Sequence, residues 1–390
     1  MTFDPEGVLP GAPDPWASSS LPAWRDAPPY AMTEMIAAEP ALAERLVRRL
    51  SVDPSAAALA DAVRTAAQAG DAIVLTGCGT SEHAAMIGAA LLDDALRAAG
   101  VADGRVASVQ AFELLGRPQT AGLVIAVSHE GGTWATNQAV SGARDAGART
   151  ALVTVSGRSP GAQLAQLVIE TTEQDQSWCH SVGYLSPIVV AATVGSLVRG
   201  APLDAVAVRA LLDSSDHVAA AEGMAAALRS CQRLLIVGSG LDHATARELA
   251  LKIEEGAHLP ATALQLETIR HGHLASADER TGLVLVLTDA EARGALVVER
   301  ATAVLRSAAA IGMPAAAVIA ADLGDDVAVE LTPAGRAAVP LTTHLPRAAA
   351  AALGTAIPIQ LLAERLARAR GTNPDTIGRE DPRQAAAADA

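Results

Sequence analysis

Lysine is almost absent from this sequence of 390 residues. Lys252 is its only lysine, and arginine supplies every other basic side chain. Because the sequence uses arginine wherever a positive charge suffices, a retained lysine indicates a position that needs a compact ammonium able to shift its pKa and lose its proton. Lys252 is therefore the first candidate for a functional residue.

Aromatic residues, cysteines and long apolar runs are scarce as well. Aromatics make up 2% of the sequence, so Ala, Val, Leu and Ile must build the core. Cys78, Cys179 and Cys231 are widely separated and lack metal-ligand spacing, which favours reduced thiols. The longest apolar run, 185–198, is shorter than the roughly 20 residues of a transmembrane helix, and the N-terminus lacks signal-peptide features. We expect a cytoplasmic protein.

The balance of charge argues against two classes of partner. The formal net charge is −14, which disfavours binding to nucleic acids and to anionic membranes. Half of the residues are apolar and 18% are charged, as in globular rather than disordered chains. A chain of this length is expected to fold as two domains.

Apolar runs that alternate with helix-like segments indicate an α/β protein. Strands are expected at 73–75, 122–127, 283–287 and 315–319, among others, and this alternation is typical of parallel sheets covered on both faces. A plan of strand, glycine turn and helix occurs twice, which indicates an internal duplication. The expected parts are a Pro-rich N-terminal arm (1–30), a first domain with N-terminal helices (31–210), a second domain (211–372) and a C-terminal tail (373–390).

Two polar turns are candidates for an anion site. The turn 77–81 (GCGTS) lies where the first strand meets a helix, so its amides and the helix dipole favour an anion. The turn 128–133 (SHEGGT) follows the next strand, at the same end of the sheet. A dinucleotide site is disfavoured, because the third glycine and the later acidic residue are missing. The alternative is that these turns only cap helices and pack tightly.

The segment 242–256 carries three charged residues on one face of a predicted helix. Glu248, Lys252 and Glu255 are spaced by four and three residues, and the imidazole of His271 follows in a His-Gly-His turn. An acid, an amine and an imidazole are the strongest chemical lead in the sequence. The alternative is a solvated ladder of ion pairs, worth a few tenths of a kcal/mol each. A metal site at the two histidines is disfavoured, because no carboxylate or cysteine stands at a suitable spacing.

Six motifs between Met32 and Arg383 carry a family resemblance. They are MTEMIAAEP, GCGTS, AVSHEGGTWAT, ALKIEEGAHLPATA, ETIRHGHLA and NPDTIGREDPR. They resemble the double-SIS (sugar isomerase) family, which includes the isomerase half of glucosamine-6-phosphate synthase and amino-sugar-phosphate deaminase/isomerases. The resemblance implies two tandem SIS-type three-layer α/β/α domains with parallel sheets. It also implies a homodimer whose active site lies between domains and subunits.

The resemblance also implies roles for residues of this chain. The family's isomerase base falls on Glu255, its ring-opening histidine, donated by the partner subunit, on His271, and its helix lysine on Lys252. A base between C1 and C2, an acid/base at the ring oxygen and a cation near the enediolate are what aldose–ketose isomerisation requires. The residues implied in substrate binding are Cys78, Gly79, Thr80, Ser81, Ser128, His129, Glu130 and Thr133.

Three departures from the family bear on the function. The chain has no glutaminase domain or N-terminal nucleophilic cysteine, so we expect no ammonia from glutamine. The synthase's C-terminal lysine falls near Ala387, where this chain has no lysine. Glu130 replaces a serine of the family's phosphate turn, and its carboxylate would repel a phosphate. Either Glu130 points away, or His129 or an arginine offsets its charge, or the substrate carries an amine that Glu130 binds. We expect an isomerase, with or without deamination, of a phosphorylated sugar or amino sugar, without metal or organic cofactor. The alternative is a non-catalytic sugar-phosphate sensor acting through a protein partner.

Overall fold

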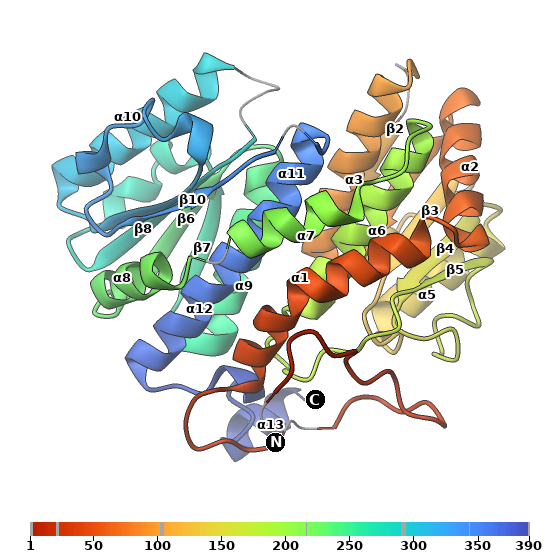
Figure 1. Cartoon of the computed structure of the whole chain (residues 1–390), viewed down its shortest axis with the longest axis horizontal. Helices are drawn as coiled ribbons and strands as arrows, with labels where there is room; N and C mark the ends of the chain where they lie inside the picture. Colours follow the sequence, from red (N-terminus) through yellow and green to blue (C-terminus); the bar gives the residue numbers. More distant parts are fainter. Residues whose placement is uncertain are drawn as a thin grey trace.

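The computed structural model describes residues 3–20, 23–101, 105–215, 217–289, 294–342 and 344–388. These residues form two five-stranded sheets with only parallel pairings, in the orders β2-β1-β3-β4-β5 and β10-β9-β8-β6-β7. The two sheets lie on either side of a central group of helices (Figure 1). The predicted α/β architecture with two parallel sheets is confirmed.

The elements of the first half run as far as α6. Its strands are β1 (Ala72–Thr76), β2 (Arg105–Ser108), β3 (Leu123–Val127), β4 (Arg149–Thr154) and β5 (Leu167–Glu170). Its helices are α1 (Ala31–Leu50), α2 (Pro54–Gln68), α3 (Thr80–Ala98), α4 (Ala111–Leu115), α5 (Trp134–Asp145) and α6 (Val182–Val198).

The second half repeats the plan of strands and helices. Its strands are β6 (Arg233–Gly238), β7 (Ala261–Gln265), β8 (Thr281–Leu287), β9 (Ala315–Ala320) and β10 (Arg336–Val339). Its helices are α7 (Ala205–Ser214), α8 (Val218–Leu228), α9 (Leu241–Ala257), α10 (Ala295–Ile311), α11 (Arg347–Gly354), α12 (Ala356–Arg370) and α13 (Pro382–Ala388). Short 3-10 helices are η1 (Thr268–Arg270), η2 (His273–Ser276), η3 (Ala321–Leu323), η4 (Val329–Leu331) and η5 (Pro374–Thr376). Because the expected domain boundary at 210 falls inside α7, we propose a boundary before this helix instead.

The central helices join the two halves into one core. Helix α3 of the first half packs against α9 of the second, and α1 packs against both α7 and α12. A single hydrophobic cluster includes Leu75 of β1 in the first half and Val284 of β8 in the second. Helix α9 is thus enclosed on several sides, which puts its charged residues inside the molecule. Within the described ranges, no helix has the length and apolarity needed to cross a membrane.

The two glycine turns have the same backbone shape. Gly79 before α3 has φ 57° and ψ −129°, and Gly240 before α9 has φ 63° and ψ −126°. A Cβ on Gly77 would lie 2.7 Å from the backbone of Ser81, and one on Gly238 would lie 2.3 Å from the backbone of Asp242. Both positions therefore require glycine for the same steric reason, and the repeated turn predicted from the sequence is a repeated structure.

Candidate functional site

A cavity of about 750 Å³ opens at the carboxyl ends of β1 and β3. Ligands of open parallel sheets bind at this end, and the volume suits a small organic molecule. Segments from the arm, the first half, α9 and the C-terminal tail meet here. The residues around the cavity are Ser18, Ser19, Cys78, Gly79, Thr80, Ser81, His129, Glu130, Gly132, Thr133, Trp178, His180, Leu251, Glu255, Ile377, Arg379 and Ala388.

Most of the predicted substrate-binding residues line this cavity. They come from the turn between β1 and α3 and from the turn between β3 and α5, so two helix N-termini face the same space. Ser128 is buried outside the lining, and its hydroxyl lies 3.4 Å from that of Thr133. Burial raises the pKa of the Cys78 thiol, so this cysteine is a neutral neighbour and not a thiolate.

The second copy of the turn shows what its geometry holds. Asp242, at the position of Ser81, is buried and accepts hydrogen bonds from the Thr288 amide (2.8 Å), the Thr288 hydroxyl (2.5 Å) and the Asp289 amide (3.0 Å). Thr288 follows β8 as Ser128 follows β3. An internal carboxylate thus fills the second turn, while the first has a serine and opens on the cavity.

Four ionisable residues form a buried chain beside the cavity. The Glu248 carboxylate lies 2.7 Å from Nδ1 of His83, accepts a hydrogen bond from the Thr80 hydroxyl (3.2 Å) and lies 3.6 Å from Nζ of Lys252. Lys252 donates to Glu255 at 2.5 Å. Burial alone would raise the pKa of Glu248, but Lys252 and His83 outweigh it and hold the pKa below its usual value. The predicted trio is therefore not a solvated ladder.

The surroundings of Lys252 favour its protonated form. Its side chain is 1% exposed and does not line the cavity. Burial lowers the pKa of its ammonium, but Glu255 and Glu248 more than reverse that and raise it above the usual value. The expectation of an amine that loses its proton is not met, because two carboxylates flank it. Lys252 is a fixed positive charge behind Glu255.

Glu255 is the charged end of the chain that reaches the cavity. Its side chain is 21% exposed and lines the cavity wall. Burial raises the pKa of its carboxyl, and the neighbouring Lys252 offsets part of this rise. A carboxylate with a raised pKa is a stronger base than an ordinary glutamate. The position and the environment of Glu255 both suit proton transfer.

Glu130 is occupied by the N-terminal arm. Its carboxylate accepts hydrogen bonds from the Ser19 amide (3.3 Å) and hydroxyl and from the Gln174 amide group (3.4 Å). Trp16 donates from its indole to the Glu130 carbonyl at 3.1 Å. Burial raises the pKa of Glu130, which these donors partly offset. The carboxylate of Glu130, in the turn 128–133, therefore points to the arm.

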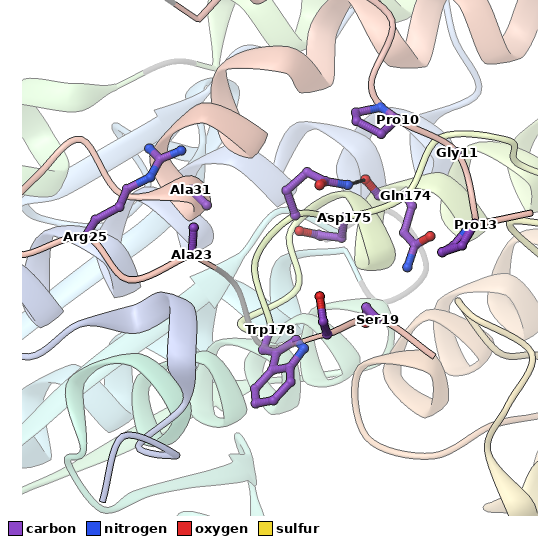
Figure 2. A pocket seen from close by; sticks show the side chains of 12 residues that line it. Pro10, Gly11, Pro13, Ser19, Ala23, Arg25, Ala31, Gln174, Asp175 and Trp178 are labelled. Carbon is purple, nitrogen blue, oxygen red and sulfur yellow. Dashed lines mark hydrogen bonds between the residues drawn. The ribbon is translucent and has the colours of Figure 1, made fainter. Parts of the chain in front are cut away.

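The arm also lines a second cavity of about 420 Å³ beside the site (Figure 2). Ser19 and Trp178 line both cavities, and Pro10, Pro13 and Gln174 lie around the second one. The arm, which the composition predicts to be extended, thus forms part of the wall of the site.

Two imidazoles face the cavity from one chain. His129 accepts the Asp175 amide proton on Nε2 (3.0 Å), and burial and the nearby His180 lower its pKa to about 3. The ring of His180 lies 5.1 Å from that of His129, and burial and Lys252 lower its pKa to about 4. Both rings are neutral at physiological pH.

His271 lies elsewhere on the surface. It follows η1, its side chain is 71% exposed, and Nε2 lies 3.1 Å from the Glu267 carboxylate. It is not among the residues that line the cavity of its own chain.

Sequence reasoning did not find several residues of the site. Trp178 and His180 lie in a loop without a regular period, and Arg379 lies in the tail. The tail is nevertheless fixed, since the Asp375 carboxylate accepts the amide protons of Ala31 and Met32, both at 2.8 Å. The motif NPDTIGREDPR was the available signal. In the described residues, no cluster of three potential metal ligands occurs.

Comparisons with known proteins agree with this architecture. Residues 67–198 match the family described as SIS domain. The chain contains a SIS domain. It is 29% identical over 319 residues to glutamine–fructose-6-phosphate aminotransferase (isomerizing) of Symbiobacterium thermophilum, and 26% identical over 328 residues to the protein of the same name in Streptomyces coelicolor. Each match covers 78% of this chain and 50% of the relative, so the chain spans about half the length of the curated relatives it matches.

Solved structures extend the likeness to both halves. The C-terminal domain of glucosamine-fructose-6-phosphate aminotransferase from Francisella tularensis has a TM-score of 0.76, with 18% identity, 91% of this chain covered and 100% of that chain. Tagatose-6-phosphate ketose/aldose isomerase from Escherichia coli has a TM-score of 0.68, with 18% identity and coverages of 92% and 97%. Glucosamine-6-phosphate deaminase from Thermotoga maritima has a TM-score of 0.65, with 15% identity and coverages of 88% and 96%. The fold is that of tandem SIS domains.

Proposed function

We propose that this protein is an aldose–ketose isomerase of a phosphorylated sugar or amino sugar, with or without loss of ammonia. The observation that carries the proposal is one cavity lined both by the Thr80–Ser81 turn and by the carboxyl of Glu255. Proteins named as sugar-phosphate isomerases and deaminases share its fold. The two turns would hold the phosphate, and Glu255 would move the proton.

The second half supports the phosphate site. In the second half, this turn and the loop after the neighbouring strand gather donors around the carboxyl oxygens of Asp242, and these donors offset part of the rise by which burial brings its pKa to about 6. In the first half, the N-termini of α3 and α5 and the hydroxyls of Ser81 and Thr133 would do the same for a phosphate. Glu130 would not oppose it, because its carboxylate is bound to Ser19.

Glu255 would act as the base of the isomerisation. It would take the proton from C2 of the open-chain aldose to give an enediol, or an enediolamine from an amino sugar, and return it to C1. The ammonium of Lys252, 2.5 Å away, keeps the carboxylate available after each transfer. A Schiff base through Lys252 is disfavoured, because that route needs a neutral amine within the cavity.

Either His271 or His180 would open the sugar ring. Since His271 is exposed on its own chain, it would have to enter the cavity of a second copy, as expected for a homodimer. His180 already lines the cavity and would serve without a partner. The two assignments predict different effects of subunit mixing.

The test of the proposal is proton exchange at the substrate carbon. A panel of hexose and hexosamine 6-phosphates is incubated with the protein in D2O, beside the unphosphorylated sugars, and deuterium at C2 is measured by NMR. We expect exchange with a phosphorylated sugar only, and a loss of at least about 1,000-fold in Glu255→Gln, because the general base is removed. Glu254→Gln is the matched control, since Glu254 bonds the Ala261 amide away from the cavity.

A sugar-phosphate sensor is the second candidate. Two features favour the sensor. Lys252, the sole lysine, is buried with a raised pKa, and the tail residue at the cavity wall is Ala388, so neither position offers a reactive amine. Saturable binding of a sugar phosphate by the wild-type protein, with no deuterium at C2, would establish the sensor and reject the isomerase.

A further inference from the structure

Arg379 is the one arginine or lysine among the described residues that line the cavity. No carboxylate of the described chain lies within ion-pair distance of its guanidinium. Its Nε is buried without a hydrogen-bond partner in the same residues. In a protein with a net charge of −14, an arginine left unpaired at a cavity has binding capacity that the fold does not use.

The guanidinium is held in place by its flat face. Its central carbon lies 4.2 Å from the centroid of the Trp178 ring, a cation–π distance. The Trp178 amide donates to the Asp375 carbonyl (3.0 Å), and the Asp375 carboxylate caps α1. The platform and the segment that carries Arg379 are therefore tied to each other and to the core, so the arginine is oriented in advance.

This geometry suits an anion. A guanidinium stacked on an indole keeps its N–H edges free, and those edges match the oxygens of a carboxylate or a phosphate. The carboxylates that line the cavity cannot serve as its partner, because Glu130 is bound to Ser19 and Glu255 to Lys252. An anionic group of the ligand would supply the partner that the guanidinium of Arg379 does not have among the described residues.

We propose that Arg379, stacked on Trp178, binds an anionic group of the ligand that enters this cavity. The inference rests on the proposed function for the identity of the ligand as a sugar derivative. The group is the phosphate of the sugar or a carboxylate carried at its other end, and both present the same oxygens to the guanidinium. Arg379 then determines which ligands are accepted, while the proton chemistry stays with Glu255.

The experiment measures binding by calorimetry with fructose, fructose 6-phosphate and 6-phosphogluconate, which carries a carboxylate besides its phosphate. If Arg379 binds the phosphate, Arg379→Gln weakens both phosphorylated compounds about tenfold or more. If it binds a carboxylate, Arg379→Gln spares fructose 6-phosphate and weakens 6-phosphogluconate alone. Fructose reports any effect independent of charge.

Arg383→Gln is the matched control in the same segment. Arg383 is 89% exposed and paired with Asp381, so its loss should leave all three affinities unchanged. Arg379→Lys keeps the charge but loses the planar stack, and we expect it to lie between wild type and Arg379→Gln. Trp178→Phe keeps an aromatic ring under the guanidinium of Arg379. It tests the stacking partner with a smaller change, in case Arg379→Gln does not fold.

Two outcomes overturn the proposal: equal affinities in wild type, Arg379→Gln and Arg383→Gln, or no binding of either phosphorylated compound by wild type at millimolar concentrations. The outcome is separable from that of the isomerase. If exchange at C2 is absent but Arg379→Gln weakens binding, the reaction is wrong and the anion site stands. If exchange proceeds in Arg379→Gln with unchanged KM and the affinity for 6-phosphogluconate is also unchanged, the anion site is wrong and the reaction stands.

Discussion

Glu39 is a buried acid outside the site. It lies on α1, it is fully buried, and only the side chain of Gln360 offers its carboxyl a hydrogen bond among the described residues. Burial raises the pKa of Glu39 well above its usual value. The folded protein therefore holds this carboxyl protonated at a pH where the unfolded chain would ionise it.

Glu39→Gln is expected to stabilise the protein, increasingly as pH rises. Above a pH of about 4.5 the unfolded chain releases the proton and the folded chain does not, so wild type loses about 1.4 kcal/mol for each pKa unit of difference, up to the folded pKa. The variant has no such titration. Urea unfolding at pH 4 to 8 should show a widening gap in its favour.

Glu44→Gln on the same helix is the control with the opposite sign. Arg48 and then Arg209 hold the pKa of Glu44 below its usual value, so its contribution is present at neutral pH and is lost as pH falls. A constant gap between Glu39→Gln and wild type across the pH range would contradict the buried-acid interpretation.

At the same scale, composition identified some site residues and not others. The scarcity of lysine selected Lys252, and its spacing from Glu248 and Glu255 gave the buried chain. The direction of its pKa shift was not predictable, because it depends on the carboxylates that burial leaves close to the ammonium. Arg379 is one of many arginines, so composition could not select it; its role depends on which ring and which cavity it meets.

The start of α1 depends on a residue far along the chain. Tyr30 precedes the helix without a side-chain cap, and the Asp375 carboxylate takes the first amide protons instead. Thr33, in the first turn, does not act as a cap, because its hydroxyl donates to Glu364. A cap supplied from the C-terminal segment is invisible to any local pattern.

Asp375→Ala is expected to destabilise the protein by about 1–2 kcal/mol, because α1 loses its cap. It should also weaken binding of fructose 6-phosphate, because the segment that orients Trp178 and Arg379 is released. Asp53→Ala removes the ordinary cap of α2, where Asp53 accepts the Ser55 amide at 2.8 Å. Thermal unfolding and calorimetry should show lost stability in both variants but weakened binding only in Asp375→Ala.

Pattern-based prediction succeeded for central elements and failed at sheet edges. The strands that the sequence missed are β2, β7 and β10, each at or toward an edge, with alternating exposed residues instead of an apolar run. Each is recognised as a strand only by its pairing with a buried neighbour. Helix α1 continues through Pro40, which a local pattern does not predict.

At the scale of the whole molecule, subunit mixing tests the origin of the ring-opening imidazole. If each site of a homodimer combines Glu255 of one chain with His271 of the other, Glu255→Gln and His271→Gln are each inactive alone. Random mixing gives hybrids in half of the dimers, each with one intact site, so about a quarter of the wild-type exchange rate should return.

Exchange in D2O after co-refolding of the two variants provides the measurement. Glu255→Gln mixed with Glu254→Gln is the control and should give the activity of the second variant alone, without complementation. Full activity in His271→Gln alone would assign the ring opening to His180 instead.

Because the carboxylate of Asp242 fills the second glycine turn, the two halves of the molecule are not equivalent. The first turn opens on the cavity, whereas the second is filled by the carboxylate of Asp242, and α9 of the second half contributes Glu255 to the cavity wall. The two halves therefore form one composite cavity instead of a matched pair. Either half expressed alone would therefore lack part of the cavity wall.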